Sequence, residues 1–400
     1  MSGLMVSETG SRVVLPPALM DQVRASLAGS DDPVTPARVA QAVREAGGVL
    51  GDQAVLAVVE ELRAEITGAG PLDALLQQTG VTDVLVNGPH DVWLDRGSGL
   101  ERTGVRFRDE AAVRRLATRL AARGGRRLDD AVPYVDARLP GGARLHAIIP
   151  PVSPAGTVIS LRVPARVSFG LEDLVACGSV PDVVAAWLRA LIAARVAFLV
   201  TGGTGTGKTT VLGALLSLVD PAERLLLVED SAELQVNHPH VVRLESRPVN
   251  VEGAGGIGLN VLVRQSLRMR PDRVVVGEVR GAEVVDLLAA LNTGHDGGCG
   301  TLHANSARDV PARLEALGVA AGLTRDAVHA QAAAALHVII HLTRRSDGLR
   351  RVAALALVRR SAGEGLVVHP ALHVDPDGKV HEQDGAASLE QLLLADGGPG

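Results

Sequence analysis

Cysteine is nearly absent from this chain of 400 residues, which carries only Cys177 and Cys299. Two isolated cysteines cannot build a disulfide framework or a Cys-x-x-Cys metal site. Such a composition is typical of proteins in a reducing compartment. We therefore expect a protein that stays inside the cell.

Aromatic residues make up only 2% of the chain, and the formal net charge is −5. Single-stranded nucleic acid is usually bound by aromatic side chains that stack on bases and by a basic surface that attracts phosphates. Because both features are scarce, no stable nucleic-acid partner is expected. Hydrophobic residues, at 46%, are sufficient for the cores of two or three domains.

A signal peptide and an uninterrupted membrane span are also missing from the sequence pattern. The N-terminus lacks a basic segment followed by an apolar core. The longest apolar run, residues 183–200, contains Arg189 and Arg195, which are costly at a bilayer centre. A buried helix over 182–194, followed by a strand, explains this run better.

Lysine occurs only at Lys208 and Lys379. Lys208 belongs to a Gly-x4-Gly-Lys-Thr motif that follows the apolar stretch 196–200, as a phosphate loop requires. Its ammonium is expected to reach the β- and γ-phosphates of ATP, and Thr209 to hold Mg²⁺. The expected nucleotide-binding residues are Gly202, Gly203, Thr204, Gly205, Thr206, Gly207, Lys208, Thr209 and Thr210.

Changes in composition predict a division of the chain into five parts. These are a helical region (1–70), a small α/β domain (71–163), a linker (164–170), a larger α/β domain (171–380) and a flexible tail (381–400). Helices are expected over 18–28, 36–46 and 52–66, and strands near 83–87, 91–95 and 104–107.

The rest of the small domain is predicted to contain an amphipathic helix over 109–123 and strands over 143–149 and 157–163. Its arginines are expected at one region of the sheet: Arg138, Arg144 and Arg162. They are either ordinary solvated side chains or groups that reach the γ-phosphate. For Arg162 the second interpretation is favoured.

The larger domain alternates apolar strands with helices, which predicts an open, mostly parallel α/β sheet. Strands are expected over 196–200, 225–228, 273–276 and 337–342. Residues 338–342 and 352–358 are predicted to form a hairpin at the sheet edge.

Acidic residues follow two of these strands. Glu229, Asp230 and Glu233 come after the second, and Glu278 ends the third. Ligands of open α/β sheets bind at the carboxyl ends of the strands, so Glu233 and Glu278 are candidate ligands of Mg²⁺ or its waters, and Glu278 is also a candidate base. The alternative for the first group is N-capping of a helix.

Two histidines, His295 and His303, lie in a glycine-rich stretch and could sense or stabilise the γ-phosphate. Together with Cys299 they also suggest a zinc site. This alternative is disfavoured, because the glycines between 294 and 300 oppose the helix that would align the three side chains.

Taken together, these motifs resemble the secretion ATPase superfamily of type II and type IV systems. Four elements match in order: 202–210 as the Walker A loop, 229–233 as the aspartate box, 277–280 as the Walker B segment, and 294–305 as the histidine box. Segments 267–272, 291–295, 136–140 and 160–162 are similar to the branch that serves tight-adherence (Flp) pili and conjugation-like systems.

The resemblance implies a homo-hexameric ring of subunits, each with a PAS-like N-terminal domain and a RecA-like C-terminal domain. It implies a cytoplasmic ATP-hydrolysing motor for pilus assembly or secretion, which associates peripherally with an integral platform protein of the inner membrane. Glu278, Glu233 and His303 then match the catalytic positions, with Arg280 in the Walker B segment. Arg138, Arg144 and Arg162 match the arginines that close over the γ-phosphate.

Some positions depart from the family pattern, among them Gly141 and Gly281, where acids are common. Two other functions stay open. One is a DNA-translocating or conjugation-associated RecA-like motor, and the other is a scaffold that binds ATP without useful hydrolysis.

Overall fold

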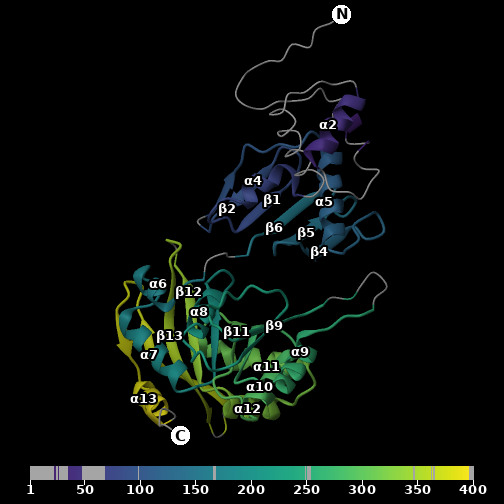
Figure 1. Cartoon of the computed structure of the whole chain (residues 1–400). Helices are drawn as coiled ribbons and strands as arrows, with labels where there is room; N and C mark the ends of the chain where they lie inside the picture. The colour runs from purple at the N-terminus through teal and green to yellow at the C-terminus, as the bar shows by residue number, and fades with distance from the viewer. Residues whose placement is uncertain are drawn as a thin grey trace, which may run out of the picture. The chain divides into compact units, whose positions relative to one another are not determined.

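The computed structural model describes residues 22–23, 26, 35–46, 68–97, 99–164, 168–247, 249, 254–345, 347–361, 363 and 365–395. The chain divides into two compact units, residues 1–163 and 164–400 (Figure 1). In the N-terminal region the helix expected over 36–46 is confirmed as α2 (Pro36–Glu45). The helices expected over 18–28 and 52–66 lie largely outside the described residues.

Unit 1 contains a six-stranded sheet in the order β3-β2-β1-β6-β5-β4, in which all neighbouring strands are antiparallel. The strands are β1 (Asp83–Val86), β2 (Val92–Asp95), β3 (Leu100–Arg102), β4 (Tyr134–Arg138), β5 (Arg144–Ile148) and β6 (Val158–Arg162). Two short helices precede the sheet, η1 (Gly70–Leu72) and α4 (Asp73–Leu76). Strand β4 was not predicted.

Helix α5 (Glu110–Arg123) covers one face of this sheet. It begins where the Asp109 carboxylate accepts the N–H of Ala112 at 2.8 Å. Its buried residues are those expected from the 3.6-residue period: Val113, Leu116, Ala117, Leu120 and Ala121. The opposite face of the sheet is more open, as the alternating burial along β4 and β5 shows.

The strand expected over 104–107 is wrong, because the third strand is β3 at Leu100–Arg102. After β3 the chain turns, with the Thr103 hydroxyl accepting the N–H of Val105 at 3.2 Å. Phe107 then buries its ring in the core of unit 1 and donates its N–H to Pro89. The segment is therefore a loop that is anchored in the core by its one buried residue, Phe107.

Unit 2 is built on a nine-stranded sheet in the order β15-β14-β13-β12-β7-β11-β10-β8-β9. The strands from β12 to β9 in this order are parallel, and β13, β14 and β15 extend the sheet in antiparallel fashion. The parallel strands are β7 (Phe198–Gly202), β8 (Leu225–Glu229), β9 (Val241–Glu245), β10 (Arg273–Val279), β11 (Cys299–His303) and β12 (Val338–Arg344). The predicted fold class is thus confirmed.

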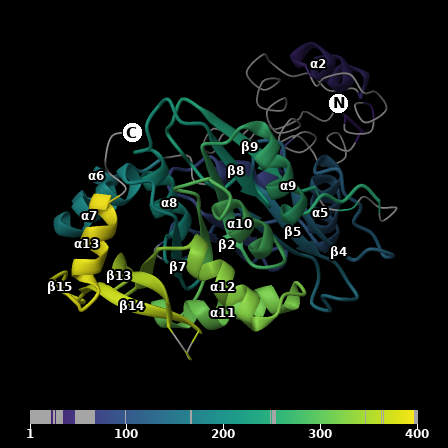
Figure 2. The same cartoon turned by 90° about the horizontal axis from the view of Figure 1, so that it is seen from below.

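Helices cover both faces of this sheet (Figures 1 and 2). One core joins Phe198 and Val200 to helices α6 (Leu171–Ala176), α7 (Asp182–Ala193) and α8 (Lys208–Leu216). The other joins Leu199 to the helices of the second layer. These are α9 (Leu259–Ser266), α10 (Glu283–Leu291), α11 (Val310–Ala320) and α12 (Arg325–Ala335), with the short helices η2 (Leu267–Met269) and η3 (Ala307–Asp309). Burial on both faces explains the continuous apolar strands.

Two expectations about the end of the chain are wrong. The hairpin of β12 and β13 (Arg350–Ser361) is present, but it does not form the sheet edge, because β14 (Gly365–Val374) and β15 (Val380–Glu382) continue the sheet. The tail over 381–400 was expected to be flexible, yet its described part contributes to β15 and forms helix α13 (Ala386–Ala395), while residues 396–400 lie outside the described residues. Helix α13 is ordered because Leu389 is buried in the first core and Leu392 and Leu393 pack against it. No described helix is both long and apolar enough to cross a bilayer.

Candidate functional site

The site lies at the carboxyl edge of three adjacent parallel strands, β7, β11 and β10. The predicted phosphate loop follows β7, His303 ends β11, and Glu278 lies near the end of β10. His303 is in register with Gly202. The strand order therefore places the histidine between the loop and the glutamate, although the three segments are far apart in the sequence.

The phosphate loop curls around the buried side chain of Lys208. Gly207 adopts φ 91°, a left-handed conformation suited to glycine, and α8 begins at the next residue. The Lys208 ammonium donates to the carbonyls of Gly202 at 3.1 Å and Gly203 at 2.8 Å. Burial lowers the pKa of Lys208, and the negative charge of Glu278 opposes this shift. The loop thus holds a partly desolvated cation at the N-terminus of a helix, where anions bind.

Strand β10 carries a bulge at Gly277 and Glu278. Val276 pairs with Gly300 and Val279 with Leu302, so β10 has one more residue than β11 over this interval. The Thr301 hydroxyl donates to the Gly277 carbonyl at 2.6 Å. A β-carbon on Gly277 would lie 2.8 Å from Cγ of Glu229, so a glycine is needed beside that buried carboxylate. The bulge sets the direction of Glu278.

Lys208, His303 and Glu278 form a continuous polar line. The Lys208 ammonium lies 3.3 Å from Nδ1 of His303, and Nε2 of the same ring lies 2.8 Å from Oε1 of Glu278. An ammonium can only donate, so Nδ1 accepts and the ring proton of a neutral histidine is on Nε2, facing the carboxylate. The structure thus brings together three of the residues predicted from separate motifs.

The predicted aspartate box has mixed roles. Glu229 is buried, and its Oε1 accepts the N–H groups of Glu233 at 2.9 Å and Leu234 at 2.8 Å. Burial raises the pKa of Glu229, while the two N–H groups oppose the rise. Glu229 therefore fixes the turn after β8. The alternative of helix N-capping is wrong, because β8 is followed by β9 with no helix between them. The Glu233 side chain is exposed.

Asp230 connects this turn to the Walker B segment. It accepts the Ser246 hydroxyl at 2.8 Å and pairs with Arg280. Nη1 of Arg280 also lies 4.0 Å from Oε2 of Glu278. Arg280 thus lies beside the Glu278 end of the polar line, near the carboxylate oxygen that His303 does not contact.

His295 is not part of this cluster. It precedes β11, at the opposite end of that strand from His303, and its Nδ1 lies 3.1 Å from the carbonyl of Ala290. Cys299 is fully buried at the start of β11, and burial raises the pKa of its thiol to about 12. Among the described residues no three His, Cys, Asp or Glu side chains are grouped to hold a metal ion, so the zinc alternative has no support there.

Sequence reasoning missed His341, which is buried beside the phosphate-loop strand. Its Nδ1 lies 2.9 Å from the hydroxyl of Thr201, directly before the loop. Burial lowers the pKa of His341, and a hydrogen bond to the carbonyl of Asn305 opposes this shift. The ring therefore links β7 to the end of the histidine box. The sequence does show a polar residue, His341, within the apolar stretch 338–342. It does not show which side chain this histidine contacts.

The three arginines predicted in unit 1 are cross-strand neighbours. Arg138 is opposite Arg144, and Arg144 is opposite Arg162, so all three share one face at one end of the sheet. Arg144 forms a double hydrogen bond with Asp136, at 3.0 and 2.6 Å, and this pair lowers the pKa of Asp136. Arg162 is exposed.

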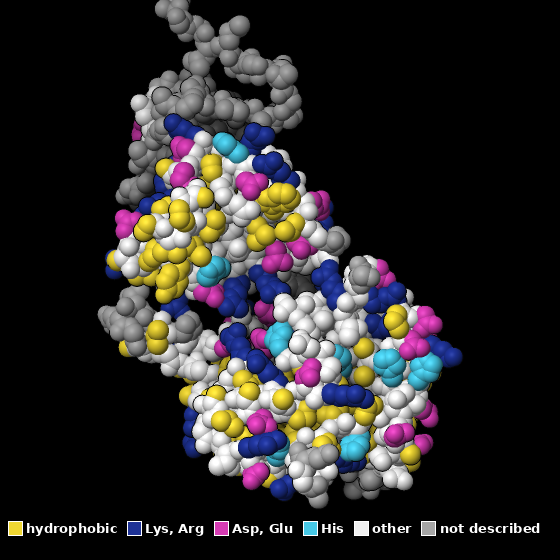
Figure 3. All heavy atoms as spheres, turned by 180° about the vertical axis from the view of Figure 1, so that it is seen from behind, with side chains coloured by type: hydrophobic (Ala, Val, Ile, Leu, Met, Phe, Trp, Pro, Cys, Tyr) yellow, Lys and Arg dark blue, Asp and Glu magenta, His cyan; other side chains and the backbone are white. Residues whose placement is uncertain are grey.

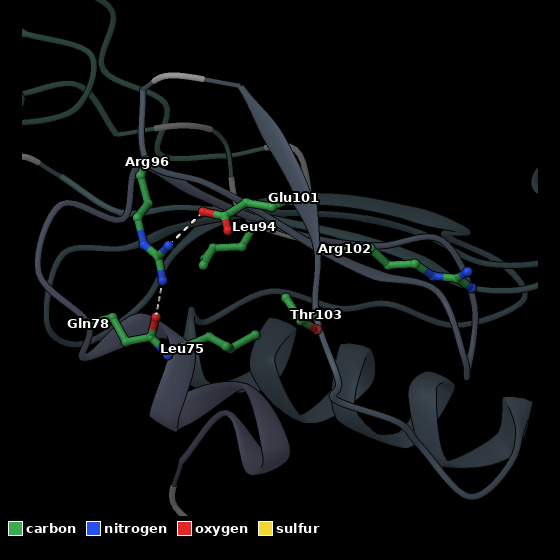
Figure 4. Close-up of a pocket in the computed structure, with 7 residues that line it drawn as sticks. All are labelled: Leu75, Gln78, Leu94, Arg96, Glu101, Arg102 and Thr103. Atoms are coloured by element: carbon green, nitrogen blue, oxygen red, sulfur yellow. Dashed lines mark hydrogen bonds and ion pairs between the residues drawn. The ribbon is translucent and has the colours of Figure 1, made fainter.

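Unit 1 also has a small hollow, lined by Leu75, Gln78, Leu94, Arg96, Glu101, Arg102 and Thr103 (Figure 4). Arg96 points across it and donates to Glu101 at 2.6 Å and to Gln78 at 2.7 Å. Hydrophobic side chains also gather on one face of unit 1 (Figure 3). Neither feature contains a residue of the polar line.

Comparison with known proteins gives the family. The family model described as "Type II/IV secretion system protein" matches residues 65–388. A putative conjugal transfer protein of Mycobacterium tuberculosis is 53% identical over 351 residues, covering 86% of this chain and 98% of that protein. The probable conjugal transfer protein TrbB of Sinorhizobium fredii is 31% identical, covering 72% of this chain and 86% of its own length.

Among solved structures, the ATPase DotB of Yersinia pseudotuberculosis has a TM-score of 0.50 and 16% sequence identity, with 81% of each chain covered. This likeness concerns the fold. The family match extends over most of the chain and includes the phosphate loop, the bulged strand β10 and β11. The chain therefore belongs to the type II/IV secretion system protein family.

Proposed function

We propose that this chain is an ATP-hydrolysing motor subunit that powers pilus assembly or protein secretion. The observation that carries the proposal is the polar line from Lys208 through His303 to Glu278 at the carboxyl edge of the parallel sheet. It brings the ammonium of Lys208, which can bind phosphate, close to the carboxylate of Glu278, which can orient a water molecule. Phosphoryl transfer requires these two functions close together.

The residues present fit a nucleotide and a divalent cation. The loop supplies backbone N–H groups at the start of α8, and the partly desolvated ammonium of Lys208 donates to two loop carbonyls that an anion can replace. Thr209 follows it and is partly exposed, and Glu278 is half-buried, so both are available as oxygen ligands of Mg²⁺ or its waters. The exposed carboxylate of Glu233 is a further candidate. Bound Mg²⁺ would neutralise charge on the phosphates.

Glu278 is the proposed base or water-orienting residue. His303 holds its Oε1 through Nε2, and the Thr301 hydroxyl secures the bulge from which Glu278 projects. His303 therefore acts by fixing the carboxylate relative to the ammonium.

The working assembly is proposed to be a homo-hexameric ring at the cytoplasmic face of the inner membrane, bound to an integral platform protein. In this proposal Arg138, Arg144 and Arg162 close over the γ-phosphate. Their alignment on one sheet face supports a shared task for the three side chains. The family match supports a role in secretion.

Measurement of ATP turnover tests this function. The full chain should hydrolyse ATP in the presence of Mg²⁺, Lys208→Ala should abolish nucleotide binding, and Glu278→Gln should retain binding while losing turnover. An unaltered chain that binds no nucleotide, or a Glu278→Gln variant that turns over ATP as fast as the unaltered chain, would refute the proposal. Retained assembly activity with Glu278→Gln would instead favour the scaffold function.

A second candidate is a motor that handles DNA. Two relatives are named conjugal transfer proteins, which favours it. The scarcity of aromatic residues and the net charge of −5 count against direct DNA contact. Salt-dependent binding to single-stranded DNA, together with DNA-stimulated ATP turnover, would establish this alternative.

A further inference from the structure

The hairpin of β12 and β13 lies beside the phosphate loop on the side away from His303 and Glu278. Strand β7 is flanked by β11 on one side and β12 on the other, and Leu342 of β12 is in register with Gly202. Two residues beyond Leu342, Arg344 is opposite Arg350. Both arginines are therefore at the carboxyl edge where the loop begins.

Their side chains share the sheet face on which α8 lies. Residues 338, 340 and 342 of β12 and residue 352 of β13 are buried in the core that includes α8. Because side chains alternate along a strand, Arg344 and Arg350 continue that face past the end of the core. They consequently extend toward the helix whose N-terminus the phosphate loop forms.

Distances place both side chains against the loop. Nη1 of Arg344 lies 3.9 Å from the position of a β-carbon on Gly205, and Cδ of Arg350 lies 3.4 Å from the position of one on Gly207. The Arg350 stem thus packs across the loop, immediately before Lys208. Positive charges gathered around a helix N-terminus repel one another, and a bound polyphosphate relieves this repulsion.

We propose that Arg344 and Arg350 bind the diphosphate that ATP and ADP have in common, from the β12 side of the loop. This inference rests on the proposed nucleotide binding. His303 and Glu278 lie on the opposite side of the loop and serve the terminal phosphate, whereas Lys208 belongs to the loop and is expected to reach both the β- and γ-phosphates. The hairpin arginines therefore contribute to the affinity for both nucleotides.

The test compares Arg344→Ala and Arg350→Met, since methionine keeps an unbranched stem across Gly207 and removes only the cation. The matched control is Arg360→Ala, an exposed arginine at the far end of β13. Titration calorimetry with ADP and with a non-hydrolysable ATP analogue should show about a tenfold or greater loss of affinity for both in each variant. The control should bind both nucleotides like the unaltered chain.

Two results would overturn the inference while leaving the proposed function intact. One is unchanged affinity for both nucleotides in Arg344→Ala and Arg350→Met. The other is a loss of affinity for the ATP analogue alone, which would assign the arginines to the γ-phosphate. Failure of the unaltered chain to bind ADP or the analogue would overturn the proposed function, and this inference with it.

Discussion

Nε2 of His303 lies 2.8 Å from Oε1 of Glu278, while Nδ1 of the same ring faces the ammonium of Lys208. One imidazole thus fixes the separation between the phosphate-binding cation and the carboxylate. The order β7-β11-β10 makes this possible, because the strand that ends in His303 lies between the other two. The histidine is best described as a positioning residue for Glu278.

Replacement of His303 by Ala should lower ATP turnover by on the order of 10²-fold, since small displacements of catalytic groups have effects of this size. Affinity for ADP should stay within a few-fold, because the loop and Lys208 are unchanged. Steady-state kinetics and ADP titration measure the two effects. His295→Ala, at the other end of β11, is the comparison and should change neither; equal losses in both variants would contradict a specific role for His303.

Thr301→Val should destabilise unit 2 and misplace Glu278. The buried Thr301 hydroxyl satisfies the carbonyl of Gly277 in the bulge, and an unsatisfied buried acceptor costs about 1–3 kcal/mol. Urea unfolding gives the change in free energy, and Thr301→Ser, which keeps the hydroxyl, should recover most of it. If the Val and Ser variants unfolded alike, the hydroxyl would have no such role.

Much of the fold could be predicted because apolar runs and helical periodicity are local signals. The buried face of α5 and the strands β7, β8, β10 and β12 are examples. Strands β4 and β9 were missed because they carry few buried apolar residues, with patterns of alternating or partial burial. Strand β11 lies in the glycine-rich stretch, where no strand was predicted. Its glycine at position 300 is needed there, since a β-carbon would meet the carbonyl of Val276.

The residues of the site could be predicted from the sequence more completely than the contacts between them. Sequence motifs predicted Lys208, Glu278 and His303 as site residues. Only the strand order shows that His303 lies between Lys208 and Glu278 and that His295 lies away from both. The role of Glu229 as an acceptor for two backbone N–H groups depends on a turn that no pattern specifies. Arg344 and Arg350 could not be predicted from the sequence. They lie beside the loop because β12 pairs with β7, which is more than 130 residues earlier in the chain.

The stability of unit 2 should fall in mild acid partly because of His341. Burial lowers the pKa of this histidine in the folded chain, whereas the unfolded chain has the ordinary value of about 6.5. The unfolded chain therefore binds a proton that the folded chain resists, and the free energy of unfolding decreases as pH falls below about 6.5. The negative charge of Asp309 raises the pKa of His341, and the positive charge of Lys208 lowers it.

Urea unfolding at pH 7.5 and pH 5.5 tests whether the free energy of unfolding decreases with pH because of His341. The unaltered chain should lose more stability between the two values than His341→Gln, whose side chain does not titrate. Other groups titrate equally in both proteins, so the difference between them reports His341. Equal losses would contradict the assignment.

Arg162→Ala should reduce ATP turnover while leaving ADP affinity nearly unchanged, if this exposed arginine reaches the γ-phosphate. A charge-assisted contact of this kind contributes about 1.5–3 kcal/mol, or roughly 10- to 150-fold in rate. Turnover assays and ADP titration separate the two quantities. An equal loss of turnover and ADP affinity would refute a specific contact between Arg162 and the γ-phosphate.

The central claim is that Lys208, His303 and Glu278 form a centre for ATP hydrolysis, and Glu278→Gln tests it most directly. Glutamine keeps the shape of the side chain and removes its charge and basicity. The account predicts that this variant binds ATP within a few-fold of the unaltered chain and loses at least about 10²-fold in Mg²⁺-dependent turnover. Turnover that survives the substitution at close to the original rate would contradict the claim.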